Sequence, residues 1–224
     1  MIPAFNEENF IKKSLLSVIN QEIDADEIIV VDNNSTDKTA EIVQRLGVRV
    51  VSEKKQGMTP ARNAGFNACK YDIIARIDAD VVVPTYWIKT IKKNFGSKRI
   101  DALTGPIILS DSKSKIISKT TLPSHLYLES LRILSKGKRY LQGPNMSLTC
   151  DIWSKVKDIV NLDDSKVHED IDLSLKITRS QGIIGYDKEL IVFGSARRIT
   201  KHPESFFIEY PVRMFKTFLA DKKQ

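Results

Sequence analysis

The stretch "EIIVVDNNSTDKTAEIVQRLGVRVVSE", residues 27–53, predicts one β-α-β unit. It opens and closes with short runs rich in Val and Ile, at 27–32 and 48–53, which are typical of buried strands. Between them we expect a helix that begins behind Ser35 as its N-cap and ends at Gly47. Because strands that alternate with helices form parallel sheets, this stretch predicts a sheet covered by helices.

The same alternation extends to both sides of this unit. We expect strands at 1–5 and 72–78 and a helix over 59–70. After position 100 the pattern changes, and the expected elements are a strand at 100–109, a helical segment at 114–134 interrupted by Pro123, a strand or loop at 140–150, a short helix near Trp153, a helix at 169–180 and a late strand at 185–195. The fold class is therefore α/β, with a Rossmann-like, mostly parallel central sheet flanked by helices and a mixed second half.

Length and composition favour one domain. The chain has 224 residues, of which 42% are hydrophobic, and no linker-like segment divides it. We expect a single domain over 1–224, in which 1–100 binds a nucleotide-type ligand, 101–200 completes the acceptor side and 201–224 is a tail. The formal net charge of +7 suits anionic ligands, anionic lipid or nucleic acid.

Three of the expected strands end in acidic or amide side chains. These are Asn6 with Glu7, Asp32, and Asp78 with Asp80. Because the carboxyl ends of parallel strands share one rim, where ligands of such sheets bind, we expect these groups to lie close together. Asp and Asn also cap helices and form turns, and that ordinary role is our interpretation of Glu8 and Asp37.

The Asp78 and Asp80 pair is the strongest chemical signal. Two carboxylates this close raise each other's proton affinity unless a cation lies between them. Mg²⁺ prefers one or two carboxylates together with phosphate oxygens and water. We therefore expect a divalent ion between Asp80 and a diphosphate, where it stabilises a departing nucleoside diphosphate. Arg62, near a helix start behind a glycine turn, offers a further positive charge.

A second acidic group lies in "VHEDIDLSLKI", residues 167–177. Acids at a helix start complement the helix dipole, which is one interpretation of this pattern. The alternative is that one carboxylate acts as a general base for an acceptor hydroxyl. His168 is a lone histidine, a residue type that is more often incidental than catalytic.

The chain resembles the family 2 inverting glycosyltransferases of GT-A fold in six segments that occur in order. These are "IPAFNEE", "VVDNNSTDKT", "GMTPARNAG", "RIDADVVVP", "GPNMSLTCDIWSKV" and "HEDIDLSLKI". The resemblance covers residues 1–200. It implies transfer of a sugar from a nucleotide-diphosphate donor to an acceptor, with inversion at the anomeric carbon and with Mg²⁺ or Mn²⁺ as cofactor.

The resemblance also implies roles for single residues. Those at the donor nucleoside are Pro3, Phe5, Glu7, Asp32 and Asn33. Those at the sugar, metal, acceptor and base are Asp78, Asp80, Asn145 and Asp170, with Glu169 beside the base. Asn33 stands where many relatives have a second Asp, which leaves both UDP- and GDP-sugars open as donors. The QxxRW signature of processive synthases is missing, and Arg197 and Arg198 are expected over the diphosphate instead, which favours transfer of a single sugar.

Two other function classes remain open at this point. "DADVV" also fits the motif of haloacid dehalogenase-like phosphatases, with Asp78 as nucleophile, but the later GDxxxD motif of that class is missing. The other alternative is a non-catalytic sugar-nucleotide-binding protein, for which retention of Glu169 beside Asp170 is unexpected. No basic groove rich in aromatic residues indicates nucleic acid.

Location and acceptor are indicated only coarsely. The chain shows no signal peptide and no apolar run of membrane-spanning length, and Cys69 and Cys150 lack CxxC spacing. We expect a cytoplasmic protein in a reducing compartment that acts on a glycan or lipid-linked acceptor. The stretch 205–219 mixes aromatic residues with Arg213 and Lys216, so it either packs on the core or places the protein at the inner face of the membrane.

Overall fold

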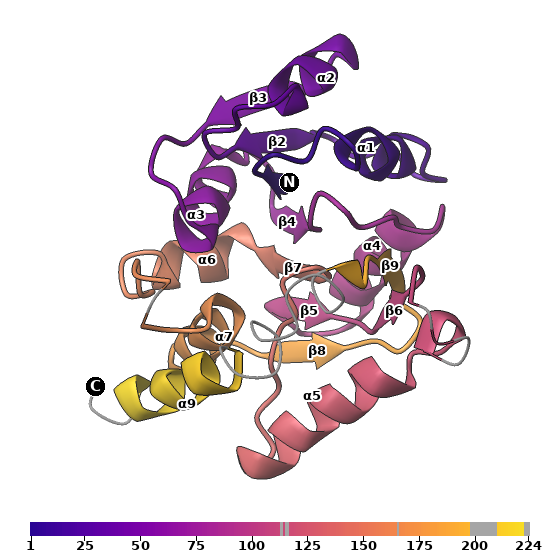
Figure 1. Cartoon of the computed structure of the whole chain (residues 1–224). Coiled ribbons are helices and arrows are strands. Elements are labelled where there is room, and N and C mark those ends of the chain that lie inside the picture. The colour runs from indigo at the N-terminus through magenta and orange to yellow at the C-terminus, as the bar shows by residue number, and fades with distance from the viewer. Residues whose placement is uncertain (113, 115–116, 165, 198–209, 222–224) are drawn as a thin grey trace.

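The computed structural model describes residues 1–112, 114, 117–164, 166–197 and 210–221 (Figure 1). Its strands are β1 (Ile2–Ala4), β2 (Ile29–Asp32), β3 (Arg49–Ser52), β4 (Ile73–Arg76), β5 (Ala102–Thr104), β6 (Ile107–Leu109), β7 (Met146–Thr149), β8 (Ile184–Tyr186) and β9 (Val192–Gly194). Its helices are α1 (Ile11–Ile19), α2 (Thr39–Arg45), α3 (Met58–Ala68), α4 (Trp87–Ser97), η1 (Ile117–Lys119), α5 (Leu122–Leu134), α6 (Cys150–Val156), α7 (Glu169–Arg179) and α9 (Tyr210–Asp221).

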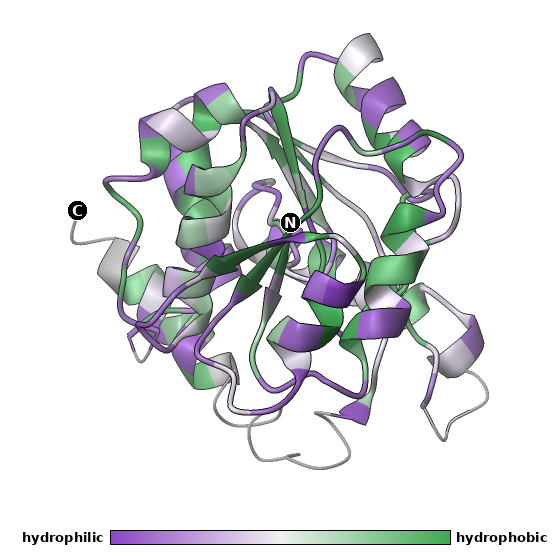
Figure 2. Ribbon diagram, turned by 90° about the horizontal axis from the view of Figure 1, so that it is seen from above, coloured by the Kyte–Doolittle hydropathy of each residue, from purple (hydrophilic) through white to green (hydrophobic). Residues whose placement is uncertain are grey.

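The first half forms the expected parallel sheet. Strands β1, β2 and β3 pair in parallel in the order β1-β2-β3, and α3 packs on all three while α2 packs on β2 and β3. Because β2 has neighbours on both faces, Ile29, Val30 and Val31 are almost completely buried. Figure 2 shows these apolar strands in green between helices whose outer faces are purple.

The second half is mixed, as expected. The order of its larger sheet is β4-β7-β5-β8, in which β7 is antiparallel to β4 and β5 while β8 is parallel to β5. The main chain of Met1 joins β1 to β4, because its nitrogen donates to the Ala75 oxygen at 2.6 Å and its oxygen accepts from the Ile77 nitrogen at 3.4 Å. Strands β6 and β9 form a separate parallel pair.

The helix after β2 begins later than the sequence predicts. It starts at Thr39, and the Ser35 hydroxyl accepts a hydrogen bond from the Asn6 nitrogen at 3.1 Å instead of capping the helix. Lys38 is the N-cap residue, and Asp37 before it accepts a hydrogen bond at Oδ1 from the Thr39 nitrogen at 2.9 Å. The prediction of Ser35 as N-cap was wrong because the residues after Asp32 form a loop that is tied to the end of β1.

Two expected strands are each divided in two. The segment 100–109 breaks into β5 and β6 at Gly105 and Pro106. A Cβ on Gly105 would lie 2.0 Å from the Leu190 oxygen, so only glycine permits this close approach of the two chain segments. The segment 185–195 likewise contributes to both β8 and β9.

The described part of the tail packs on the second half. Met214 and Phe218 of α9 contact a cluster that includes Leu131 of α5 and Leu175 of α7. The Thr217 hydroxyl accepts from the His168 nitrogen at 2.7 Å, next to the start of α7. Residues 201–209 and 222–224 of the tail lie outside the described residues. None of the described helices has the length and apolar character needed to cross a bilayer.

Candidate active site

The rim of the first sheet carries a group of charged residues that we call the rim cluster: Glu7, Asp80 and Arg197. Glu7 follows β1, Asp80 follows β4 and Arg197 follows β9, so three distant segments meet here. Arg197 Nε donates to Asp80 Oδ2 at 2.9 Å, and its Nη2 donates to Glu7 Oε1. The guanidinium also lies 4.3 Å from the centre of the Phe10 ring. Arg198, expected beside Arg197, lies outside the described residues.

Glu7 lies in an environment that opposes its ionisation. Burial raises the pKa of Glu7, and Arg197 opposes this shift while the charges of Asp80 and Asp78 add to it. The second carboxylate oxygen, Oε2, is buried and accepts no hydrogen bond from the described residues. Among the described residues, one carboxylate oxygen of Glu7 is therefore left without a hydrogen-bond donor.

The carboxylates of the rim cluster are of a type that can bind a divalent cation. Arg197 already places a positive group against Glu7 and Asp80, and hard carboxylate oxygens are the ligands that Mg²⁺ prefers. The described residues contain no group of three or more His, Cys, Asp or Glu side chains arranged to hold a metal by themselves. Asp80 and Asp78 therefore suit a metal whose remaining ligands are phosphate oxygens and water.

Below the rim lies a second group, the buried ion-pair cluster, formed by Arg62, Arg76, Asp78, Glu169 and Asp170. Arg76 Nη1 donates to Glu169 Oε1 at 2.5 Å, and its Nη2 donates to Asp78 Oδ1 at 3.1 Å. Arg62 Nη1 donates to Glu169 Oε2 at 2.7 Å. Both arginine side chains are completely buried, so these pairs are shielded from solvent.

Local structure explains how these residues meet. Arg76 is the last residue of β4, and Asp78 follows two positions later at the sheet rim. Glu169 and Asp170 are the first two residues of α7, where the helix dipole favours negative charge. Arg62 lies on α3 and reaches Glu169 across the interface between the two halves of the chain.

One carboxylate oxygen of Asp170 accepts a hydrogen bond, and the other accepts none from the described residues. Its Oδ2 accepts from the Gly143 nitrogen at 2.7 Å, whereas Oδ1 lies 3.8 Å from Arg76 Nη1 and accepts no hydrogen bond from the described residues. Burial raises the pKa of Asp170, and the neighbouring charge of Glu169 raises it further. A buried carboxylate with a free oxygen and a raised pKa has the properties of a general base.

The pKa of Glu169 is shifted in the opposite direction to that of Asp170. Burial disfavours its ionised form, but the charges of Arg76 and Arg62 outweigh this effect and hold the pKa of Glu169 below its usual range. Burial similarly disfavours the charge of Arg76, yet Glu169 and Asp78 raise the pKa of Arg76. The cluster thus keeps Glu169 ionised, whereas Asp170 binds its proton more tightly than an ordinary aspartate does.

The side chains of Arg62 and Asn145, which were expected to contact ligands, form hydrogen bonds inside the protein instead. Arg62 does not face the rim, because its guanidinium bonds to Glu169 and to Asn63 Oδ1. Asn145, expected on the acceptor side, is completely buried, and its amide bonds to Trp87 Nε1, the Leu190 oxygen and the Pro106 oxygen. Both side chains therefore stabilise the protein interior next to the site and do not point to the rim.

Asn33 is also buried, and its amide holds the loop before α3. Its Nδ2 donates to the oxygens of Glu53 and Lys55, and its Oδ1 accepts from the Gly57 nitrogen. The other residues expected at the nucleoside lie along the same rim: Pro3 lies in β1, Phe5 is 45% exposed, and Asp32 ends β2 and accepts from the Ser35 nitrogen.

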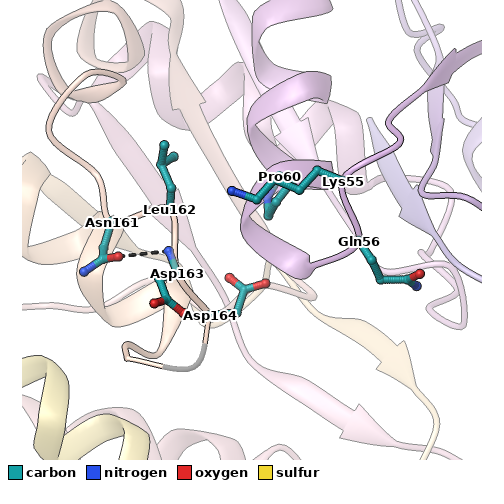
Figure 3. Close-up of a pocket in the computed structure, with 7 residues that line it drawn as sticks. All are labelled: Lys55, Gln56, Pro60, Asn161, Leu162, Asp163 and Asp164. Carbon is teal, nitrogen blue, oxygen red and sulfur yellow. Dashed lines mark hydrogen bonds between the residues drawn. The ribbon is translucent and has the colours of Figure 1, made fainter.

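A pocket of about 410 Å³ opens between the loop before α3 and the loop before α7 (Figure 3). Asp164 lies at its edge and accepts hydrogen bonds from the Thr59 nitrogen at 3.1 Å and from the Thr59 hydroxyl. This contact fixes the second loop to the first turn of α3. The pocket is lined by none of the described carboxylates of the rim cluster.

Sequence reasoning missed Arg76 and Gly143. Arg76 lies at the end of the apolar strand "DIIARID", just before two aspartates, and a cation in such a place signals a buried ion pair. A Cβ on Gly143 would lie 2.8 Å from Asp170 Oδ1 and 3.1 Å from Arg76 Nη2, so glycine is required here. Nothing in the local sequence indicates that contact.

Solved structures share this architecture. A mannosyltransferase from Pyrobaculum calidifontis, in complex with GDP-Man and Mn²⁺, aligns with 100% of this chain and 63% of its own, with a TM-score of 0.76 and 16% identity. Glucosyl-3-phosphoglycerate synthase from Mycobacterium tuberculosis, with Mn²⁺, UDP and phosphoglyceric acid, aligns with 98% of this chain and 76% of its own, with a TM-score of 0.67 and 17% identity. These similarities show the GT-A fold.

Proteins of similar sequence include a polysaccharide synthase and a protein named as a glycosyltransferase. The poly-beta-1,6-N-acetyl-D-glucosamine synthase of Staphylococcus epidermidis is 27% identical over 189 residues, which cover 79% of this chain and 44% of that protein. The uncharacterized glycosyltransferase EpsJ of Bacillus subtilis is 25% identical over 158 residues, or 68% of this chain and 44% of that protein. The chain thus spans less than half the length of these relatives. The family model described as "Glycosyl transferase family 2" matches residues 1–156, and the chain belongs to that family.

Proposed function

We propose that this chain is a glycosyltransferase that moves one hexosyl group from a UDP- or GDP-sugar to an acceptor hydroxyl, with inversion at the anomeric carbon. The observation that carries the proposal is the buried ion-pair cluster. In it, Arg76 joins Asp78 on the donor side to Glu169 and, at 3.8 Å, to Asp170. A base is thereby held next to the place where the sugar would lie.

In this proposal Asp170 removes the proton of the acceptor hydroxyl at its bare Oδ1. The acceptor oxygen forms a bond to the anomeric carbon while the bond from that carbon to the donor phosphate oxygen breaks. The departing electron pair stays on the nucleoside diphosphate. A single displacement inverts the anomeric carbon and needs no covalent sugar–protein intermediate, which agrees with the presence of one base.

The proposed metal site consists of Asp80 and Asp78, which hold Mg²⁺ or Mn²⁺ together with phosphate oxygens. Such an ion, when bound, supplies Lewis-acid stabilisation of the leaving diphosphate. The donor nucleoside would lie along Pro3, Phe5, Glu7 and Asp32, with Asn33 holding the adjacent loop. Arg62 acts through Glu169 rather than by direct contact with the donor.

For the acceptor, we propose a glycan or a lipid-linked glycan in cell-surface polysaccharide synthesis. The name of the relative from S. epidermidis, a synthase of a poly-N-acetylglucosamine, supports this choice. We also propose a location at the inner face of the membrane, contacted through the tail. Membership of family 2 replaces the phosphatase interpretation of Asp78.

The test combines binding and turnover. Isothermal titration of UDP and GDP with and without Mn²⁺ should show metal-dependent binding that Asp80→Asn abolishes and Asp170→Asn retains. Transfer from the matching sugar nucleotide should fall roughly 10²-fold or more in Asp170→Asn. Asp158→Asn, which changes an exposed aspartate outside the site, is the control. Metal-independent binding contradicts the metal role of Asp80, and binding without transfer by the wild type favours a sugar-nucleotide-binding protein.

A further inference from the structure

Helices α5 and α9 lie at the same end of the molecule, in the lower part of Figure 1. They share one apolar cluster, to which α5 contributes Leu131 and α9 contributes Met214 and Phe218. This cluster accounts for one face of each helix. The opposite face of each helix carries exposed apolar side chains as well, together with one charged residue, Glu129 on α5 and Lys216 on α9.

On α5 this second apolar face consists of Leu122, Leu126 and Ile133. Their spacing of four and seven residues places them on one side of the helix. They are 53%, 58% and 72% exposed, whereas Leu128 and Leu131 on the packed side are 7% and 2% exposed. The helix therefore buries one apolar stripe and exposes three apolar side chains on the other side, where Glu129 also lies.

On α9 the same arrangement recurs with Val212, Phe215 and Leu219. They are spaced by three and four residues and are 46%, 64% and 46% exposed. Thr217, on the packed side, is 1% exposed and bonds to the main chain before α7. We call these six exposed side chains, from α5 and α9 together, the α5–α9 face.

The concentration of apolar surface here is unusual for this chain. Of the sixteen large apolar side chains that are exposed in the described residues, seven lie on α5 and α9, the seventh being Tyr127. The others are distributed over the rest of the molecule. Exposed apolar side chains that gather in one place mark interaction surfaces, whereas scattered ones are normal.

The charges of the same two segments are mostly positive. The basic residues are Arg132, Lys136, Lys138, Arg139, Arg213 and Lys216. Within 122–139 and 210–221 the acidic residues are Asp221, at the end of α9, and Glu129, which pairs with Arg132 at 2.7 Å and lies 3.9 Å from Arg139. This excess of positive charge favours a partner that is apolar and negatively charged.

We propose that the α5–α9 face docks on an anionic lipid bilayer, with its apolar side chains inserted at the interface and its basic residues at the headgroups. A second copy of the chain is a poorer occupant, because it would bring one basic surface against another. The inference deepens the proposed location at the membrane by naming a two-helix surface in place of the tail alone. It depends on that location and is independent of the transfer chemistry.

The test is sedimentation of the intact protein with vesicles of phosphatidylcholine, with and without phosphatidylglycerol. Binding should require the anionic lipid and weaken with salt. The double variant Ile133→Glu, Phe215→Glu should abolish binding. The double variant Lys136→Gln, Lys216→Gln should weaken it by about fivefold for each charge removed. Ile159→Glu, which alters a 49% exposed side chain outside the face, should bind as the wild type does.

The outcomes separate this inference from the proposed function. Equal binding by the wild type and by Ile133→Glu, Phe215→Glu would overturn it, as would a lack of binding to either vesicle. A dimer in light scattering that the same variant converts to a monomer would show self-association instead. Mn²⁺-dependent binding of UDP or GDP, measured on each variant in parallel, reports on the nucleotide site alone and confirms that the variants are folded.

Discussion

Arg76 lies between the aspartate at the end of β4 and the two acids that begin α7. Together with Arg62 it provides two positive charges for three carboxylates: Asp78, Glu169 and Asp170. The charge that is not matched falls on Asp170, which lies farthest from Arg76 and has one bare oxygen. Burial is the main cause of the raised pKa of Asp170, and the charge of Glu169 adds to it.

Neutral substitutions of the two acids should affect stability in opposite directions. Glu169→Gln leaves Arg62 and Arg76 buried and short of negative charge, and we expect it to lower the free energy of unfolding by about 3–5 kcal/mol. Asp170→Asn removes a carboxylate that is costly to ionise, and we expect a gain of about 1 kcal/mol near neutral pH. Urea unfolding of the two variants and the wild type measures both effects.

The gain from Asp170→Asn should depend on pH. Because the folded chain binds the Asp170 proton more tightly than the unfolded chain does, wild-type stability falls as pH rises from the ordinary aspartate pKa to the raised pKa. The variant does not share this fall, so its advantage should be small in acid and constant above the raised pKa. An advantage that is the same at every pH would show that the pKa of Asp170 is not shifted.

Removal of Arg197 should strengthen metal binding in the absence of nucleotide. The guanidinium bonds to Asp80 and Glu7, so a cation must compete with it for these carboxylates. Because the side chain of Arg197 is 28% exposed, the ion pairs are modest, and we expect Arg197→Ala to bind Mn²⁺ roughly two- to fivefold more tightly in calorimetry. Arg45→Ala, which breaks an exposed pair on α2, is the matched control. Weaker Mn²⁺ binding by Arg197→Ala would contradict this competition.

The sequence draws attention to acidic residues more readily than to the residues that support them. Asp78 and Asp80 stand out because paired carboxylates at a strand end are unusual without a cation, and their role as metal ligands stays a prediction. The positions of Arg62 and Asn145 could not be predicted, since a motif gives a residue's place along the chain and not the direction of its side chain. Arg62 pairs with a residue 107 positions away, which no local pattern reveals.

At the scale of elements, the segment before β7 contacts Asp170, the proposed base. Gly143→Ala should displace Asp170, because the new Cβ would lie 2.8 and 3.0 Å from its two carboxylate oxygens. We expect transfer to fall roughly 10²-fold in steady-state kinetics. Mn²⁺-dependent binding of nucleotide should stay within about twofold, since Gly143 contacts the base and not the rim cluster.

The control for this substitution is Gly96→Ala on α4, where an added Cβ meets no atom within 4 Å. Unchanged transfer in Gly143→Ala would mean that Asp170 moves without cost or that it is not the base. Equal loss of transfer in both variants would indicate a general effect on the fold.

The order of strands and helices was predictable, but several boundaries were not. Apolar β-branched runs identified β2, β3 and β4, because burial on both faces leaves a clear signal. The start of α2 moved to Thr39 because Ser35 and Asn6 bond to each other's loops. The break between β5 and β6 depends on the approach of Leu190 to Gly105, a tertiary contact that the sequence does not contain.

At the scale of the whole molecule, the two halves of the chain are joined through the site. The main chain of Met1 connects β1 to β4, and β7 from the second half pairs with β4. The change from a parallel to a mixed sheet was predictable from the loss of strand–helix alternation after position 100. The meeting of α3, β4 and α7 at one ion-pair cluster was not, because it depends on contacts across 93 and 107 positions.

The buried ion-pair cluster sets a rule for building chimeras from this family. A crossover placed between the halves would recombine Arg62 and Arg76 from one parent with Glu169 from the other. Any graft intended to exchange acceptor preference must therefore carry these three positions as one unit. Recombination libraries cut after β4 should yield functional offspring only where both parents encode the same set of charges.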